Sequence, residues 1–160
     1  MKGYNAEIGE ERILDHELVK KIREFNRYYT VWLNVFTKGY LGTDFSWPES
    51  RTLFEIWLFP GINATELCEH LNMDKSYISR IIAKLEKNGF ITRELVLGSK
   101  GIKKLWLTDI GVEKARQIDT NGDNQIIDKL KTMDVEKCQK LCEAMLFIEN
   151  TLREHEKCKN

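Results

Sequence analysis

The sequence predicts a mainly α-helical chain that forms one compact domain and carries a single short β-hairpin. Long stretches place apolar residues at alternating steps of three and four, which is the periodicity of amphipathic helices. Only two prolines and ten glycines interrupt the 160 residues, and strand-like composition is confined to one stretch after Gly89. A chain of this length buries one hydrophobic core and is too short for two independent domains.

Two helices are predicted in the N-terminal third of the chain. The first spans about residues 15–38, because its apolar side chains keep helical spacing as far as Phe36. The second begins at Ser46, where Glu49 three residues later completes a capping box, and it ends near Phe59.

Two shorter helices separated by a tight turn are predicted over residues 63–71 and 74–87. Asn63 and Asp74 are residue types that cap helix N-termini, and Asn72 between the helices tolerates a positive φ. This spacing is typical of a helix-turn-helix.

The remaining third is predicted to hold the hairpin and two further helices. Residues 90–97 and 102–107 are rich in strand formers and flank a glycine-bounded tip at residues 98–101. Thr108 caps a helix that runs toward Met133, with Asn121 to Asn124 as a candidate break. A final helix begins at about Asp134 and carries a stripe of apolar residues.

Charge is distributed unevenly, although the whole chain is neutral. Between Asp74 and Lys104 eight basic residues face three acidic ones, so this segment carries +5 and the rest of the chain −5. The polarisation directs attention to the second helix of the helix-turn-helix and to the hairpin that follows it.

The second helix of the pair is predicted to present a polar face to double-stranded DNA. Its apolar side, Ile78, Ile81, Ile82 and Leu85, packs inward. The opposite side divides into Ser76, Tyr77 and Arg80, which can reach base edges in a major groove, and Lys75, Ser79 and Lys84, which suit phosphates.

The hairpin adds a second basic element directly after the helix-turn-helix. Lys100, Lys103 and Lys104 lie on and beside its glycine-flanked tip. We expect this wing to approach a neighbouring minor groove or the phosphate backbone.

Four blocks of the sequence resemble the signature of MarR-family regulators, and together they span nearly the whole chain. They are Asn63-Ala64-Thr65-Glu66-Leu67, Ser79-Arg80-Ile81-Ile82, residues 85–93 and Leu107-Thr108-Asp109-Ile110-Gly111. The stretch from Gly39 to Glu55 also resembles the regulator half of proteins that fuse this module to an acetyltransferase, for which no residues remain here. One departure is the wing, where Ser99-Lys100-Gly101 stands in place of the family's Asp-x-Arg and the arginine is absent.

The resemblance implies a single domain over residues 1–160 that forms a homodimer. Residues 1–42 and 109–160 would supply dimerisation helices, and residues 46–108 a winged helix-turn-helix lobe. The dimer interface would include Leu141, Met145, Ile148 and Leu152 of the final helix. Such a protein is expected to repress transcription from a pseudo-palindromic operator and to release DNA when a small aromatic or anionic effector binds.

Aromatic residues gather around the first two predicted helices. Trp32, Phe36, Trp47 and Phe54 are candidates to line an effector pocket, while ordinary core packing is the alternative interpretation.

Other function classes receive less support from the sequence. No nucleophile with a base, phosphate-binding glycine loop or metal-ligand spacing is present, so we expect no enzyme, no cofactor and no metal. The N-terminus lacks the apolar core of a signal peptide and no long apolar run follows, which predicts a cytoplasmic protein without a membrane partner. Two alternatives stay open: a protein-interaction module that docks an acidic partner, and a redox sensor acting through Cys138 or Cys142.

Overall fold

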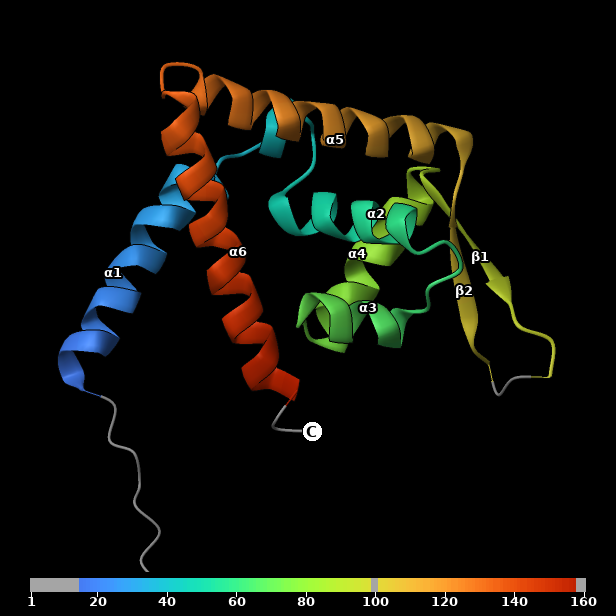
Figure 1. Cartoon of the computed structure of the whole chain (residues 1–160). Helices are drawn as coiled ribbons and strands as arrows, with labels where there is room; N and C mark the ends of the chain where they lie inside the picture. Colours follow the sequence, from blue (N-terminus) through green and yellow to red (C-terminus); the bar gives the residue numbers. More distant parts are fainter. Residues whose placement is uncertain (1–14, 99–100, 158–160) are drawn as a thin grey trace, which may run out of the picture.

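The architecture is helical with one two-stranded sheet, as a computed structural model of the chain shows for residues 15–98 and 101–157. Figure 1 shows the path of the chain. The elements are α1 (His16–Trp32), the 3-10 helix η1 (Tyr40–Gly42), α2 (Trp47–Leu58), α3 (Ala64–Leu71), α4 (Lys75–Lys87), β1 (Ile91–Leu95), β2 (Lys103–Leu107), α5 (Asp109–Leu130) and α6 (Val135–Lys157). The predicted fold class, a winged helix-turn-helix with a hairpin wing, is confirmed.

The hydrophobic core lies where α2, α3, α4 and the sheet meet. Helix α4 contributes Ile78, Ile81, Ile82 and Leu85, all of them buried, as its apolar periodicity predicts. Further side chains close the core from the other elements: Leu53 and Ile56 of α2, Leu67 of α3, Ile91 of β1, Leu105 of β2 and Ile118 of α5.

The wing is an antiparallel hairpin in which Ile91 pairs with Leu107 and Leu95 pairs with Lys103. The outer edge of β2 is also occupied, because the segment between α2 and α3 lies against it. Gly61 N donates to Leu105 O at 3.0 Å, and Leu105 N donates to Ile62 O at 3.0 Å. The base of the wing is thereby attached to the segment that leads into the helix-turn-helix.

Helix α5 runs along one side of the molecule from the wing to the beginning of α6 (Figure 1). Its start is held at the corner between α4 and β1: the Thr108 hydroxyl donates to Gly89 O at 2.6 Å and accepts from Gly111 N at 3.1 Å. Further along, the Asn121 side chain donates to Leu41 O of η1 at 2.7 Å. The predicted break at Asn121 to Asn124 is absent, and this amide is used in a tertiary contact instead.

The first helix is shorter than predicted. It ends at Trp32, and Asn34 then adopts a left-handed φ of 56°, so the apolar spacing that reaches Phe36 does not continue as helix. Phe36 is 81% exposed, and the freed carbonyl of Leu33 accepts from Gln125 Nε2 of α5 at 3.4 Å.

Helices α1 and α6 stand apart from the helix-turn-helix, both at the far end of α5 (Figure 1). Neither of these two helices buries a single residue. Among the described residues, no helix is long and apolar enough to cross a membrane.

Two glycines of α5 are expected to respond oppositely to substitution by alanine. A Cβ at Gly111 would lie 1.9 Å from Phe90 O, so Gly111→Ala should lower the free energy of unfolding by about 1–3 kcal/mol. A Cβ at Gly122 would meet only Leu41 Cδ1 at 3.8 Å, so Gly122→Ala should stabilise the helix by about 0.5–1 kcal/mol. Urea unfolding measures both, and a Gly111→Ala variant as stable as the parent chain would contradict the close approach.

Candidate nucleic-acid interface

The turn between α3 and α4 has the geometry that a helix-turn-helix requires. Asn72 adopts φ 48° and ψ 48°, as the sequence predicts for this position, and lets the chain reverse within three residues. The Asp74 side chain then accepts from Tyr77 N at 2.8 Å and caps α4. The orientation of α4 is thereby set relative to α3.

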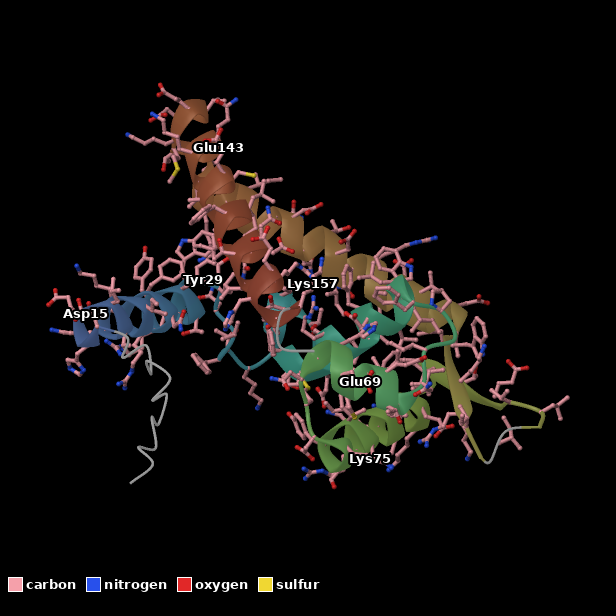
Figure 2. All side chains as sticks on the ribbon, turned by 60° about the horizontal axis from the view of Figure 1, so that its bottom comes forward. Asp15, Tyr29, Glu69, Lys75, Glu143 and Lys157 are labelled. Atoms are coloured by element: carbon pink, nitrogen blue, oxygen red, sulfur yellow. The ribbon has the colours of Figure 1, made fainter. Side chains whose placement is uncertain are left out.

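Opposite its buried isoleucines, α4 presents an exposed polar face. Lys75, Ser76, Ser79 and Arg80 are exposed, and Figure 2 shows Lys75 at the outer edge of the molecule, on the side away from Glu143. Tyr77 is half-buried, and the Arg80 guanidinium lies 5.4 Å from the centre of its ring. The stacked ring restricts the arginine to one side of the helix.

Lys84, the last of the predicted phosphate contacts on α4, is held by a carboxylate of the same chain. Its Nζ lies 2.6 Å from Glu49 Oε1, while Glu49 Oε2 accepts from Ser46 N in the capping box of α2. Burial opposes ionisation of Glu49, but the hydrogen bonds from Lys84 and from Ser46 outweigh it and lower the pKa of the carboxyl. The pair therefore ties α4 to α2 at neutral pH.

The described part of the wing carries two exposed lysines, Lys103 and Lys104. Lys100 lies outside the described residues. At the base of the wing, Arg93 Nη2 lies 2.6 Å from Glu86 Oε2 near the end of α4. This ion pair connects β1 to the helix that precedes it.

A cleft of 490 Å³ separates the wing from the helix-turn-helix. Ser79 of α4 lines one wall and Lys103 of β2 the other, and Thr65 stands at the beginning of α3. Hydroxyl groups and a lysine around an open cleft are groups that contact phosphate oxygens.

A second cavity, of 270 Å³, lies between η1, α2 and α5. Phe54 and Ile118 give it apolar surface, while Tyr40, Ser50 and Arg51 add polar groups. The Ser50 hydroxyl is buried and has no hydrogen-bond partner among the described residues. Burial raises the pKa of Tyr40 above 10.0, despite the opposing effects of Arg51 and Trp47, so its hydroxyl keeps its proton.

The four aromatic candidates for an effector pocket do not surround one cavity. Phe54 lines the cavity beside α2, and Trp32 lines a separate one of 260 Å³ between α1 and α6. Trp47 and Phe36 line neither of these two cavities. These four residues are close together in the sequence and are all aromatic, but α1 ends at Trp32 and they do not come together in space.

The cavity between α1 and α6 also receives three of the four predicted dimer residues. Leu141, Met145 and Ile148 face it from α6, and Leu152, 59% exposed, follows one turn later. From α1 come Phe25, Tyr29 and Trp32, whose rings stack in a row with centroids 5.5 and 5.6 Å apart. Of the thiols considered for redox sensing, Cys138 is half-buried and Cys142 exposed.

Two ion pairs and one carboxylate–histidine contact between elements were not predicted from the sequence. They are Glu49 with Lys84, Glu86 with Arg93, and Glu55 with His70. The partners in the first and last pair are separated by 35 and 15 residues, so helical periodicity contains no signal for them. The available hint was an acidic residue, Glu55, next to the apolar Leu53 and Ile56 on the buried side of α2.

One protein-family model matches the part of the chain that contains the helix-turn-helix. The family model described as the MarR family matches residues 45–95, which hold α2, the helix-turn-helix and β1. A comparison with curated proteins gives no significant match.

Solved structures match over most of the chain. Sco3205 of Streptomyces coelicolor, a MarR-family regulator solved in complex with DNA, has a TM-score of 0.68 at 22% identity and covers 90% of this chain and 92% of its own. FabT of Streptococcus pneumoniae, also in complex with DNA, has a TM-score of 0.67 at 17% identity, with coverages of 88% and 99%. PcaV of Streptomyces coelicolor, solved with its natural ligand, has a TM-score of 0.58 at 13% identity, with coverages of 94% and 98%.

The two capping glutamates offer a measurement of the tie between α2 and α4. Glu49→Ala and Glu66→Ala each remove a capping-box carboxylate, and each should cost about 0.3–1.5 kcal/mol of unfolding free energy. Glu49→Ala should cost more, because it also removes the partner of Lys84.

The excess cost of Glu49→Ala is expected to depend on pH. Because the folded-state pKa of Glu49 is lowered from 4.5, its contribution is present at neutral pH and is lost as the pH falls through that lowered value. Urea unfolding of both variants from neutral to acid pH measures the difference. Equal costs for the two variants at neutral pH would contradict the role given to the ion pair.

Proposed function

We propose that this chain, whose residues 45–95 match the model of the MarR family, is a DNA-binding transcriptional regulator that acts as a homodimer. In this proposal α4 of each protomer enters a major groove of a pseudo-palindromic operator, and the wing contacts the flanking backbone. A small effector releases the protein from DNA, so that the regulator works as a ligand-responsive repressor.

The observation that carries the proposal is the division of α4 into two faces. Ile78, Ile81 and Ile82 clamp the helix to the core, while Ser76 and Arg80 are exposed on the other side. A rigidly held helix with an outward polar face is what base readout requires. Arg80 suits a guanine, because a guanidinium can donate two parallel hydrogen bonds to one base edge.

Charge on the described residues supports the placement of the wing. Among them, Lys75 and Arg80 on α4 and Lys103 and Lys104 on β2 make no ion pair. Lys84 is a weaker candidate for a phosphate contact than the sequence indicated, because contact with DNA would have to compete with Glu49 at 2.6 Å.

The arms formed by α1 and α6 support a dimer. Leu146 and Phe147 of α6 are 52% and 72% exposed, and Leu18 and Ile22 of α1 are 51% and 60% exposed. Apolar surface exposed on two extended helices is costly in water and is typical of an interface that a second copy covers. The second copy would close the cavity in which Leu141, Met145 and Ile148 lie.

The cavity between η1, α2 and α5 supports the effector part of the proposal. An apolar ring fits against Phe54 and Ile118, and a carboxylate on that ring can accept from Arg51 and from the unpaired Ser50 hydroxyl. An aromatic carboxylate is therefore the class of effector that this cavity favours. PcaV, a structural neighbour, was solved with a natural ligand, although its identity to this chain is low.

DNA binding is tested by mobility shift against the upstream region of the gene, with one base-reading and one phosphate-contacting residue altered. Arg80→Ala should lose sequence-selective binding, at a cost of about 1–3 kcal/mol. Lys103→Ala should weaken binding to all duplexes alike and reduce the dependence of log K on log salt by about one unit.

Lys140→Ala is the matched control, since Lys140 lies on α6 and pairs with Glu136 there. It should leave DNA affinity unchanged. Unaltered affinity in both the Arg80 and the Lys103 variant would refute this interface, and absence of any duplex binding at low salt would favour a protein-interaction module.

Dimer formation is tested by light scattering after chromatography of the full chain. Ile148→Glu places a charge in the apolar stripe of α6 and should shift the mass from dimer to monomer. Asn150→Glu places the same charge on the opposite side of the helix and should leave the dimer intact. A dimer unaffected by Ile148→Glu would show that this stripe is not the interface.

A further inference from the structure

We propose that Glu55 is a positioning residue that links the cavity beside α2 to the helix-turn-helix, by holding Arg51 of the cavity wall and His70 of α3 at the same time. The inference rests on the proposed function, in which the cavity binds an effector and α4 binds DNA, because it explains how the first could affect the second. Its basis is a row of three charged or polar side chains: Arg51 and Glu55 are one helical turn apart on α2, and Glu55 also contacts His70 of α3, 15 residues further along the chain.

The geometry of the row is continuous from the cavity to α3. Arg51 Nη2 lies 3.4 Å from Glu55 Oε2, and His70 Nδ1 lies 2.9 Å from Glu55 Oε1. The Glu55 side chain is only 9% exposed, whereas those of Arg51 and His70 are 42% and 36% exposed. The two oxygens of one buried carboxylate are thus divided between two helices.

Burial makes the carboxylate dependent on both partners. A carboxylate removed from water is tolerated when charged or hydrogen-bonding groups surround it, and it destabilises its surroundings when one partner leaves. Arg51 also lines the cavity, so a carboxylate ligand there would compete with Glu55 for the same guanidinium. Glu55 would then depend on His70 alone.

His70 is placed to transmit such a change. It lies in the last turn of α3, and its ring also packs edge-on against Phe59 at the end of α2, with centroids 5.0 Å apart. Asn72 begins the turn into α4 two residues later. Since packed helices move as rigid elements, a shift of the end of α3 changes the angle at which α4 meets a DNA groove.

The rival interpretation is an ion pair that only stabilises the fold. In that case the effects of Arg51 and His70 on DNA affinity are independent, and each variant weakens DNA binding only as far as it unfolds the protein. If the relay exists, the effects of Arg51 and His70 on DNA affinity are coupled, and this coupling requires the Glu55 carboxylate. A double-mutant cycle distinguishes coupled from independent effects.

The experiment measures DNA affinity of the full chain at fixed salt for Arg51→Gln in two backgrounds. With Glu55 present, Arg51→Gln mimics loss of the guanidinium to a ligand and should lower DNA affinity about fivefold or more. In the Glu55→Gln background the same substitution should have no effect. His70→Leu, which removes the group of α3 that contacts Glu55, should likewise abolish the effect of Arg51→Gln.

Arg153→Gln is the matched control, because Arg153 forms a surface pair with Glu149 on α6 at 2.8 Å. It should leave DNA affinity unchanged. Urea unfolding of every variant checks that the folded fraction is the same in each binding assay. Glu55→Gln is chosen because it keeps the shape of the side chain.

A ligand arm uses sodium benzoate as the probe. Benzoate should lower the DNA affinity of the parent chain and should bind Glu55→Gln, as measured by calorimetry, without changing its DNA affinity. The relay would be overturned if benzoate lowered the DNA affinity of both proteins equally, or if Arg51→Gln still lowered DNA affinity in the Glu55→Gln background. Either result would leave the proposed DNA-binding function standing. A parent chain that binds no duplex would overturn the proposed function together with the relay.

Discussion

The structure depends on the burial of one face of α4. Ile78, Ile81, Ile82 and Leu85 are almost completely removed from water, and they contact side chains of α2, α3 and the sheet. Each buried aliphatic side chain contributes roughly 1.5–3 kcal/mol relative to exposure, so this seam outweighs any single surface ion pair in the molecule. Because the seam fixes the rotation of α4 about its own axis, it also decides that Ser76 and Arg80 face outward.

Around this buried face of α4, two ion pairs and one carboxylate–histidine contact join α4 and α3 to the elements that flank them. Lys84 reaches Glu49 of α2, Glu86 reaches Arg93 of β1, and His70 of α3 reaches Glu55 of α2. Each pair joins elements whose relative angle matters for a helix entering a groove and a wing lying on a backbone. Such pairs add modest free energy, but they favour one arrangement of neighbouring elements over others. Helix α5 extends this lobe to the arms α1 and α6, which have no core of their own.

Two cavities lie beside α5, one against η1 and α2 and the other between α1 and α6, and their chemistry differs. The one between η1, α2 and α5 combines Phe54 with Ser50 and Arg51, which suits a small ligand that has both an apolar body and an anionic group. The one between α1 and α6 is lined by aromatic and aliphatic side chains, which suits the helix of a second protomer. The two cavities and the exposed polar face of α4 thus lie on separate surfaces of the molecule.

The sequence by itself determined the helix order, the caps at Asn63, Asp74 and Thr108, the left-handed turn at Asn72 and the buried face of α4, because each follows from residues within one or two helical turns. Only the tertiary structure decided where α1 ends. Asn34 adopts a backbone conformation that periodicity does not encode, and Gln125 contacts Leu33 across 92 residues of sequence. It likewise decided that Trp32 and Phe54 line different cavities and that Glu55 joins Arg51 to His70. Local propensities act over a few residues, whereas cavities and ion pairs between elements exist only once distant segments have packed together.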